Sequence, residues 1–342
     1  MEIEQLTVSE WDEELPETGR CVFHQSELLT VLADHSGADE LVLYGGRKGD
    51  RLVGMLPVFV NRNRLGIKTV SSPPPGMHVP YLGPVLMSAS PKVRKRERVN
   101  NRFTRGVLEH LDLDSRSLAF IVCSPRYKDP RPYQWGDMGL ETFFTYEVPI
   151  DGRTSEDLMS DFSKSRRREI RNGEALDVRI ERGDITDANR IYKQTSERFA
   201  EQDEYYGMDW GFVRDVITAP GARNRVYVTR APDGEFLSGV IVLYSKEGAL
   251  FWLGGVRTDY ENVSMNSLLH WTIIRDIAED PELEEIEAYD MVGAGEYRLS
   301  KFKAKFGPEL RPYYVANSGG VKMRAAKLAY RLLENSRERF PI

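Results

Sequence analysis

The chain has 342 residues, of which 41% are hydrophobic and 29% are charged. These proportions are typical of a soluble globular protein, and the length favours two domains over one. The formal net charge of −6 argues against a general nucleic-acid binder, although a local basic patch would still suit RNA. Residues 1–5 lack an apolar signal region, and no run of about 18 apolar residues occurs. We therefore expect a cytoplasmic protein.

The first 150 residues alternate between strand and helix patterns. We expect strands over 2–8, 117–123 and 141–150, helices over 26–33 and 91–111, and a hairpin over 40–60. The segment 71–80 contains three consecutive prolines, which exclude regular structure there. This loop is either functional or a plain surface connection.

The next segment follows a similar order. We expect helices over 155–172, 184–200, 209–217, 265–278 and 296–306, strands over 176–182, 249–256, 283–289 and 311–315, and a second hairpin over 225–245. Beyond them, residues 321–340 show the pattern of a basic amphipathic helix, which either packs on its own domain or lies on an anionic membrane surface.

The two hairpins share one sequence pattern. Gly54 and Gly239 occupy the same place in the second strand of each hairpin, and a Leu-Gly pair follows each of them, at 82–83 and at 253–254. A repeated α/β unit predicts two similar domains with a cleft between them, where ligands usually bind. We therefore predict domains over 1–150 and 151–316, followed by the basic helix in 317–342.

Three segments carry a family resemblance. They are the Gly-Pro-Val strand at 81–85, the junction that runs from 135 through 145–151 into the basic helix at 163–172, and the Phe-Lys helix at 299–307. In this order the chain resembles the Fem-type (FemAB-like) aminoacyltransferases and their tandem GNAT-like relatives. The resemblance implies an α/β (α+β) fold of two tandem GNAT-like domains, each with a mixed, mostly antiparallel sheet flanked by helices.

The resemblance also implies a reaction. Relatives transfer an aminoacyl or other acyl group from tRNA or another donor to an amine, often on a lipid-linked or cell-envelope precursor. An oxyanion develops in such a transfer, and a preorganised cation would stabilise it. The family motif implies that Lys303 has this role beside the acyl donor, with Phe302 packed next to it. The alternatives are a solvated helix face for Lys303 and core packing for Phe302.

Further residues are candidates for the site. Asp290, at the end of a predicted strand, is a candidate base or orienting group, or else a cap for the turn at 292–295. We expect Tyr81, Arg257 and the 71–80 loop to reach the substrate in the cleft. Basic residues of the helix over 155–172 recur at three- and four-residue spacing and suit the phosphates of a tRNA or of a lipid-linked precursor, or else form a solvated face: Lys164, Arg167, Arg168 and Arg171.

The sequence offers little support for a bound cofactor. GNAT enzymes that use coenzyme A place a glycine-rich turn before a helix, whereas residues 257–266 contain no glycine and include two carboxylates. We predict no cofactor and no metal site, with acyl-CoA or aminoacyl-tRNA as a candidate co-substrate. The histidines show no metal-ligand spacing.

Together these patterns predict an acyl- or aminoacyltransferase that joins an activated carboxyl group to an amine. The alternatives are an acetyl-CoA-dependent N-acetyltransferase and, from another class, a non-catalytic protein that binds RNA or a membrane surface. The expected partners are the acyl donor, tRNA among them, and an amine-bearing acceptor. Residues 321–340 would provide peripheral contact with the inner face of the cell membrane.

Overall fold

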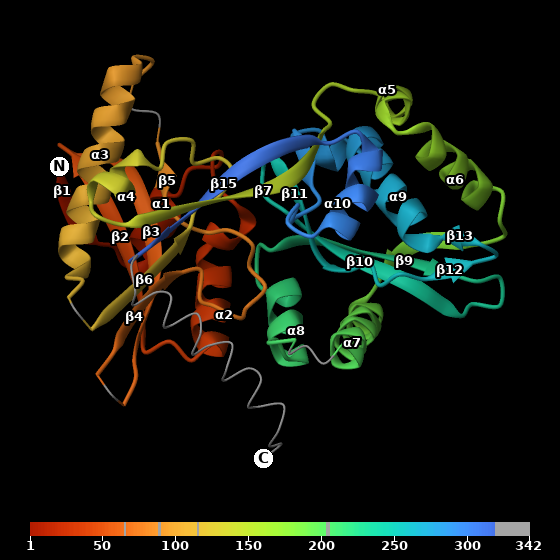
Figure 1. The fold of residues 1–342 in the computed structure, drawn as a ribbon, viewed down its shortest axis with the longest axis horizontal. Helices are drawn as coiled ribbons and strands as arrows, with labels where there is room; N and C mark the ends of the chain where they lie inside the picture. Colours follow the sequence, from red (N-terminus) through yellow and green to blue (C-terminus); the bar gives the residue numbers. More distant parts are fainter. Residues whose placement is uncertain (65, 88–89, 115, 203–205, 319–342) are drawn as a thin grey trace. The chain divides into compact units, whose positions relative to one another are not determined.

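The computed structural model describes residues 1–64, 66–87, 90–114, 116–202 and 206–318. The chain divides into two compact units, one formed by Met1–Phe143 with Pro312–Ile342 and the other by Phe144–Arg311 (Figure 1). The domain boundaries predicted from sequence, after 150 and after 316, differ from those of the two units, which fall after Phe143 and after Arg311. The second boundary differs because the last strand of the chain pairs with a strand of the first unit. The predicted tail helix over 321–340 lies outside the described residues.

A mixed sheet forms the centre of the first unit. In spatial order its strands are β1 (Glu2–Gln5), β2 (Glu40–Lys48), β3 (Arg51–Arg62), β4 (Lys68–Ser72), β6 (Ser117–Val122) and the second half of β15 (Glu309–Asn317). Strands β4 and β6 run parallel, and the other neighbours pair antiparallel. A short strand, β5 (Val85–Leu86), pairs with β3.

The helices of this unit are α1 (Val8–Glu14), α2 (Ser26–Ser36), α3 (Val93–Leu111) and α4 (Arg131–Trp135), with a 3₁₀ turn at Val22–His24. Figure 1 shows α2 and α3 on opposite sides of the sheet. The helix predicted over 91–111 is confirmed as α3, and four of its apolar side chains are buried: Val99, Phe103, Val107 and Leu111. These side chains recur at helical spacing and place α3 on the core.

The second unit has a sheet of the same kind. In spatial order its strands are the second half of β7 (Gly139–Pro149), β14 (Ala288–Asp290), β11 (Gly248–Gly254), β10 (Phe236–Tyr244), β9 (Arg223–Arg230) and β8 (Arg179–Gly183). Strands β11 and β14 run parallel, and the other neighbours pair antiparallel. A separate small hairpin joins β12 (Asp259–Tyr260) to β13 (Val263–Ser264).

Helices cover both faces of this second sheet. They are α5 (Ser155–Asp161), α6 (Lys164–Glu174), α7 (Ile185–Glu201), α8 (Trp210–Thr218), α9 (Met265–Glu279) and α10 (Tyr297–Lys303), with 3₁₀ turns at Pro281–Leu283 and Ala304–Phe306. Figure 1 shows α7 and α8 on one side and α9 and α10 on the other. The core between α9 and the sheet is apolar, with Leu269, Ile273 and Ile274 buried.

The two units repeat one order of elements. In each, a strand and two helices lead to a hairpin and a third antiparallel strand, and a helix then leads to a strand parallel to the third. One more strand completes each sheet. In the first unit it is β15, which pairs with β6, and in the second it is β7, which pairs with β14. The predicted fold class, two similar α/β domains with mostly antiparallel sheets, is confirmed.

The repeated glycines mark close approaches, although to different neighbours. A Cβ on Gly54 would meet Phe103 of α3 at 2.8 Å, whereas one on Gly239 would meet Ile191 of α7 at 2.6 Å. Gly254 has φ +104°, and a side chain there would collide with the carbonyl oxygen of Gly239. The pattern therefore identifies the repeated hairpins correctly, but the two glycines face different helices.

Three predicted elements differ from the structure. The strand that follows the first hairpin is β4, and 81–85 contributes only an isolated bridge from Leu82 to Cys123 before β5 begins. The helix predicted over 155–172 is two helices, because Phe162 is extended and Ser163 caps α6. The strand predicted over 283–289 is only Ala288–Asp290, since a 3₁₀ turn ends at Leu283.

Candidate active site

A tight turn after β14 brings two of the predicted site residues together. Oδ1 of Asp290 accepts a hydrogen bond of 2.7 Å from the backbone N–H of Val292 and one of 2.6 Å from Oγ1 of Thr145. Val292 has φ 53° and Gly293 has φ 58°. A β-branched residue rarely adopts this left-handed conformation, and such strain is concentrated at functional sites. The carboxylate of Asp290 therefore caps the turn, and the turn fixes the carboxylate.

Lys303 binds the same turn from α10. Its Nζ donates hydrogen bonds to the carbonyl oxygens of Val292 and Gly293, the latter at 2.9 Å. The side chain is buried, and this burial lowers the pKa of Lys303 to about 8, although the charges of Asp290 and Glu296 act in the opposite direction. An ammonium has three N–H groups. Two of them bind the turn, which leaves one for a substrate oxygen.

Aromatic rings form a wall at the end of α10, the helix that carries Lys303. The ring of Phe302 lies 5.6 Å from that of Phe306 and 5.8 Å from the imidazole of His270, centre to centre. Phe302 thus packs as a core residue would, which fits the packing alternative. Lys303 itself is buried, which strengthens its charge interactions.

His270 is a member of this site that the sequence did not reveal. Its Nδ1 lies 3.0 Å from the hydroxyl of Tyr289. Burial lowers the pKa of His270 to about 3, and the positive charges of Lys303 and Arg166 lower it further. The imidazole is therefore neutral at physiological pH. It adds no charge to the aromatic wall.

Arg166 is the second residue that sequence reasoning missed. Its guanidinium lies 4.4 Å from the ring centre of Phe302 and 4.3 Å from that of Phe306. It donates hydrogen bonds to Glu169 (2.7 Å), to the hydroxyl of Ser267 and to the carbonyl oxygen of Phe302 (3.2 Å). The side chain is only 1% exposed. Arg166 thus connects α6 to α9 and to the end of α10, which carries Lys303.

The four predicted basic residues of this segment have other surroundings. Lys164, Arg168 and Arg171 are exposed on α6, at helical spacing, so that they share one face. Arg167 instead donates hydrogen bonds to the carbonyl oxygens of Ser160 and Phe162, at 2.6 and 2.9 Å. The cationic face predicted from sequence therefore consists of three residues, and Arg167 joins the two helices.

Arg257 lies at the small hairpin that precedes α9. Its guanidinium binds the carboxylate of Asp259 at 2.9 Å, and both side chains are exposed. The turn of the hairpin is Glu261–Asn262, with φ 47° and 63°. This hairpin occupies the place where a glycine-rich phosphate loop would precede the helix.

Tyr81 belongs to the first unit and is buried there, 3% exposed. Its ring meets Tyr313 edge to face, with 4.8 Å between the ring centres. Its carbonyl oxygen accepts a bond of 3.4 Å from the thiol of Cys21. The role expected for Tyr81, contact with the substrate, stays a prediction.

The parallel strands β11 and β14 part near the turn. Their register ends at Leu250 opposite Asp290, whereas β11 continues to Gly254. The edge of β11 beyond Leu250 thus faces away from β10 with no pairing to β14, immediately beside the turn that holds Asp290. Parted strands of this kind can accept an extended ligand by backbone hydrogen bonding.

Within the described part of the chain, no group of three or more histidine, cysteine, aspartate or glutamate residues is placed to hold a metal ion. No described helix combines the length and the apolar character needed to cross a membrane.

A family model matches one part of this chain. Residues 160–304, which include both Asp290 and Lys303, match the family model described as an acetyltransferase (GNAT) domain. No curated protein matches the sequence. The predicted resemblance to GNAT-like acyltransferases, and with it the predicted enzyme class, is therefore confirmed at the level of this domain.

Solved structures share this fold. FemX superposes with a TM-score of 0.64 at 10% identity, and the match covers 98% of this chain and 100% of FemX. L-PGS from Bacillus licheniformis gives a TM-score of 0.56 at 13% identity, with 96% and 98% covered. The C-terminal domain of a putative lysylphosphatidylglycerol synthetase from Agrobacterium fabrum gives 0.53 at 12% identity, with 96% of each chain covered. At these identities the similarity shows the fold alone.

Proposed function

We propose that this chain, in which residues 160–304 match the GNAT domain, transfers an acyl or aminoacyl group from an activated carboxyl donor to an amine. The observation that carries the proposal is the buried ammonium of Lys303, held on a strained turn beside the carboxylate of Asp290. Such a transfer can use a cation to stabilise the oxyanion and a fixed carboxylate to orient the amine.

The proposed chemistry uses each group at one step. The nitrogen of the acceptor amine attacks the carbonyl carbon of the donor, a C–N bond forms, and an oxyanion develops on the carbonyl oxygen. Lys303 donates a hydrogen bond to that oxyanion in surroundings partly closed to water. The bond to the leaving oxygen or sulfur then breaks, and the proton lost by the amine passes to the leaving group. Asp290 orients the amine through its carboxylate.

The donor we favour is an aminoacyl ester, such as aminoacyl-tRNA. The hairpin before α9 supports this choice, because it presents the carboxylates of Asp259 and Glu261 where the phosphates of coenzyme A would otherwise bind. The exposed face of Lys164, Arg168 and Arg171 would contact the phosphates of the RNA. The acceptor we favour is an amine on a lipid-linked or cell-envelope precursor. The shared fold with a putative lysylphosphatidylglycerol synthetase supports a lipid context.

A transfer assay with matched variants tests the proposal. Labelled aminoacyl-tRNAs and acyl-CoA would be offered with amine acceptors to the wild type, to Lys303→Met and to Lys301→Met. Both variants remove one lysine charge from α10, but Lys301 is exposed. We expect Lys303→Met to lower kcat about 100-fold, as the loss of an oxyanion donor does, and Lys301→Met to leave it unchanged. Equal turnover by all three proteins, with each shown to be folded, would refute the site.

An acetyl-CoA-dependent N-acetyltransferase is the second candidate. The family description and the free edge of β11 beside Asp290 favour it. A thermal shift with acetyl-CoA separates the two, since a ligand at 100 times its dissociation constant stabilises the folded state by about 2.7 kcal/mol. A saturable shift together with acetyl transfer would favour this candidate over aminoacyl transfer.

A further inference from the structure

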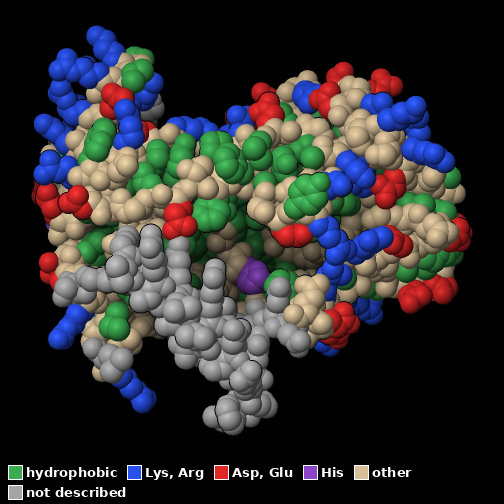
Figure 2. Space-filling model, in the orientation of Figure 1, with side chains coloured by type: hydrophobic (Ala, Val, Ile, Leu, Met, Phe, Trp, Pro, Cys, Tyr) green, Lys and Arg blue, Asp and Glu red, His purple; other side chains and the backbone are tan. Residues whose placement is uncertain are grey.

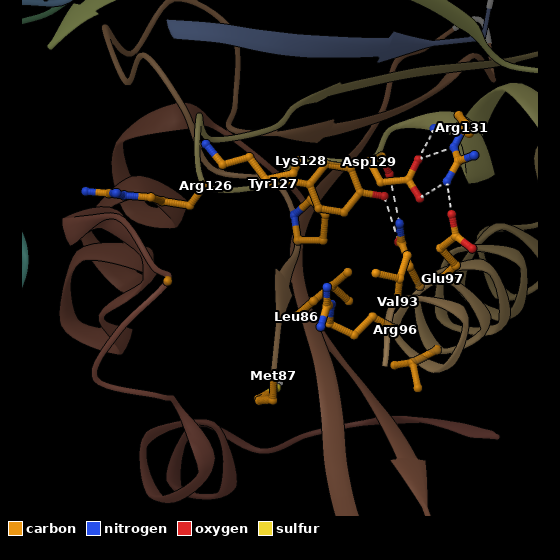
Figure 3. Close-up of a pocket in the computed structure, with 14 residues that line it drawn as sticks. Leu86, Met87, Val93, Arg96, Glu97, Arg126, Tyr127, Lys128, Asp129 and Arg131 are labelled. Atoms are coloured by element: carbon orange, nitrogen blue, oxygen red, sulfur yellow. Dashed lines mark hydrogen bonds and ion pairs between the residues drawn. The ribbon is translucent and has the colours of Figure 1, made fainter. Parts of the chain in front are cut away.

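A pocket of about 450 Å³ lies in the first unit, between the start of α3, the β5 region and the segment 126–131. Figure 3 shows Arg126, Lys128 and Arg131 along the top of the view and Arg96 below them. The volume falls within the usual range for sites that bind small molecules. The Asp290–Lys303 turn belongs to the other unit and takes no part in this pocket.

The walls of the pocket are of two kinds. One kind is charged and consists of Arg96, Glu97, Arg126, Lys128, Asp129 and Arg131. The other is apolar and consists of Pro84, Leu86, Met87, Val93 and Val99. A ligand that is complementary to both kinds of wall has a charged group and an apolar or ring-shaped part.

The two carboxylates of the lining are already bound. Arg131 binds Asp129 at 2.7 Å and Glu97 at 2.5 Å, and this arginine lowers the pKa of Asp129. Arg96 instead donates hydrogen bonds to carbonyl oxygens, those of Ser90 (3.3 Å) and Pro91 (2.6 Å). The charged lining has four cations and two anions, so its net charge is positive. The ligand's charged group is therefore an anion.

The charges at the start of α3 independently favour an anionic ligand as well. A helix begins with unpaired N–H groups and a positive dipole end, which acidic side chains normally offset. The first turn of α3 has no acidic residue, and its N-cap, Lys92, makes no side-chain hydrogen bond to the helix. Five cations lie at or near this end, namely Lys92, Arg94, Lys95, Arg96 and Arg98. Figure 2 shows Lys and Arg side chains gathered over the end of α3. This charge arrangement opposes the helix dipole unless an anion binds there.

The wall opposite Arg96 is preorganised by hydrogen bonds. Asn100 of α3 accepts a bond of 2.8 Å from the hydroxyl of Tyr127 and donates one of 2.8 Å to the carbonyl oxygen of Asp129. Both Asn100 and Tyr127 are buried. The segment that carries Arg126, Lys128 and Arg131 is thereby fixed to α3, and a ligand need not order it.

We infer that this pocket binds a compact phosphate ester, with its phosphate at Arg96 and the start of α3 and its apolar or ring portion on Leu86 and Val93. Phosphate suits the site because guanidinium groups and helix N-termini both bind it by directed N–H groups. An extended RNA would instead contact the exposed basic side chains of α3 without entering the pocket.

Calorimetric titration of the full chain with inorganic pyrophosphate and with ADP tests this inference. Two variants remove one charge each from the same helix: Arg96→Gln inside the pocket, and Arg94→Gln, which does not line it. We expect saturable binding of both probes, weakened about tenfold or more by Arg96→Gln and less than twofold by Arg94→Gln. We expect ADP to bind more tightly than pyrophosphate.

A third variant tests the apolar wall. Val93 is 59% exposed, so Val93→Ser should fold normally. We expect it to weaken the binding of ADP and to leave the binding of pyrophosphate unchanged. Three outcomes would overturn the inference: no saturable binding, equal weakening by Arg96→Gln and Arg94→Gln, or binding of single-stranded RNA that both variants weaken alike. None of these outcomes depends on transfer activity, so the test is separate from that of the proposed function.

Discussion

Oγ1 of Thr145 donates a 2.6 Å hydrogen bond to Oδ1 of Asp290, and so joins β7 to the end of β14. Both groups are buried, and the same carboxylate oxygen caps the turn at Val292. The position of the carboxylate is therefore set by two donors that belong to different elements. Lys303 then binds the carbonyl oxygens of that turn. In this way the buried ammonium and the carboxylate depend on one another for their geometry.

The variant Thr145→Val tests this dependence. It keeps the shape of the side chain and removes the donor, so Asp290 loses one of its hydrogen bonds. We expect the free energy of unfolding to fall by about 1–3 kcal/mol, because a charged acceptor loses a buried partner. We also expect kcat to fall at least tenfold while KM changes little. Urea unfolding and steady-state kinetics measure the two effects, and an unchanged kcat would show that the orientation of Asp290 does not matter.

Val292 is strained, and its replacement separates stability from activity. Glycine adopts φ 53° without steric cost, whereas a β-branched residue in this region costs about 1–3 kcal/mol. We expect Val292→Gly to be at least as stable as the wild type in thermal unfolding. We expect its kcat to fall, because a flexible turn holds Lys303 less firmly. A large loss of stability would show that the Val292 side chain contributes more than its backbone costs.

Arg166 and Arg168 are close in sequence but differ in burial, which gives a paired prediction. Arg166 is buried beneath Phe302 and Phe306, whereas Arg168 is exposed. We expect Arg166→Ala to lower the free energy of unfolding by about 2–5 kcal/mol, since it removes three hydrogen bonds and leaves a cavity beneath Phe302 and Phe306. We expect Arg168→Ala to change it by less than about 0.5 kcal/mol. Similar values for the two variants in urea unfolding would contradict the role given to Arg166.

The lowered pKa of His270 predicts how the free energy of unfolding depends on pH. Its pKa is lowered by burial to about 3 in the folded state, against about 6.5 in an unfolded chain. The unfolded chain binds more protons in this window, so the stabilisation is complete above pH 6.5 and is lost as the pH falls. We expect His270 to contribute about 1.4 kcal/mol per pH unit below pH 6.

The control for this prediction is His270→Gln. Another buried imidazole, His24, has its pKa lowered to about 4 and adds a slope of its own. The variant should therefore keep part of the acid dependence and lose the share of His270. Identical slopes for variant and wild type between pH 6 and 5 would show that His270 titrates normally.

The sequence revealed the duplicated fold because both hairpins carry the same strand-turn-strand pattern at equal spacing. Two short elements were predicted incorrectly from the sequence pattern. Leu283 and Ile286 are buried at a spacing of three, which fits the 3₁₀ turn better than the strand predicted there. Strand β4 was not predicted, because it has only five residues and leads directly into the proline loop.

The site could be predicted only in part. Lys303 and Asp290 follow from the Phe-Lys motif and from a carboxylate at a strand end. Arg166 was hidden among neighbouring cations, although Ile170 and Gly173 recur after it at spacings of four and three and mark the buried face of α6. No local pattern places His270 beside Phe302, since that contact joins α9 to α10 through the tertiary fold.

The pH dependence of kcat, measured for the wild type and for Lys303→Met with whichever donor supports turnover, tests the central claim most directly. Lys303 must be protonated to stabilise an oxyanion, and its pKa is about 8. We predict that wild-type kcat falls as the pH rises through about 8, and that Lys303→Met is about 100-fold slower and lacks this limb. A wild-type kcat that rises through pH 8, or the same profile in both proteins, would contradict the account.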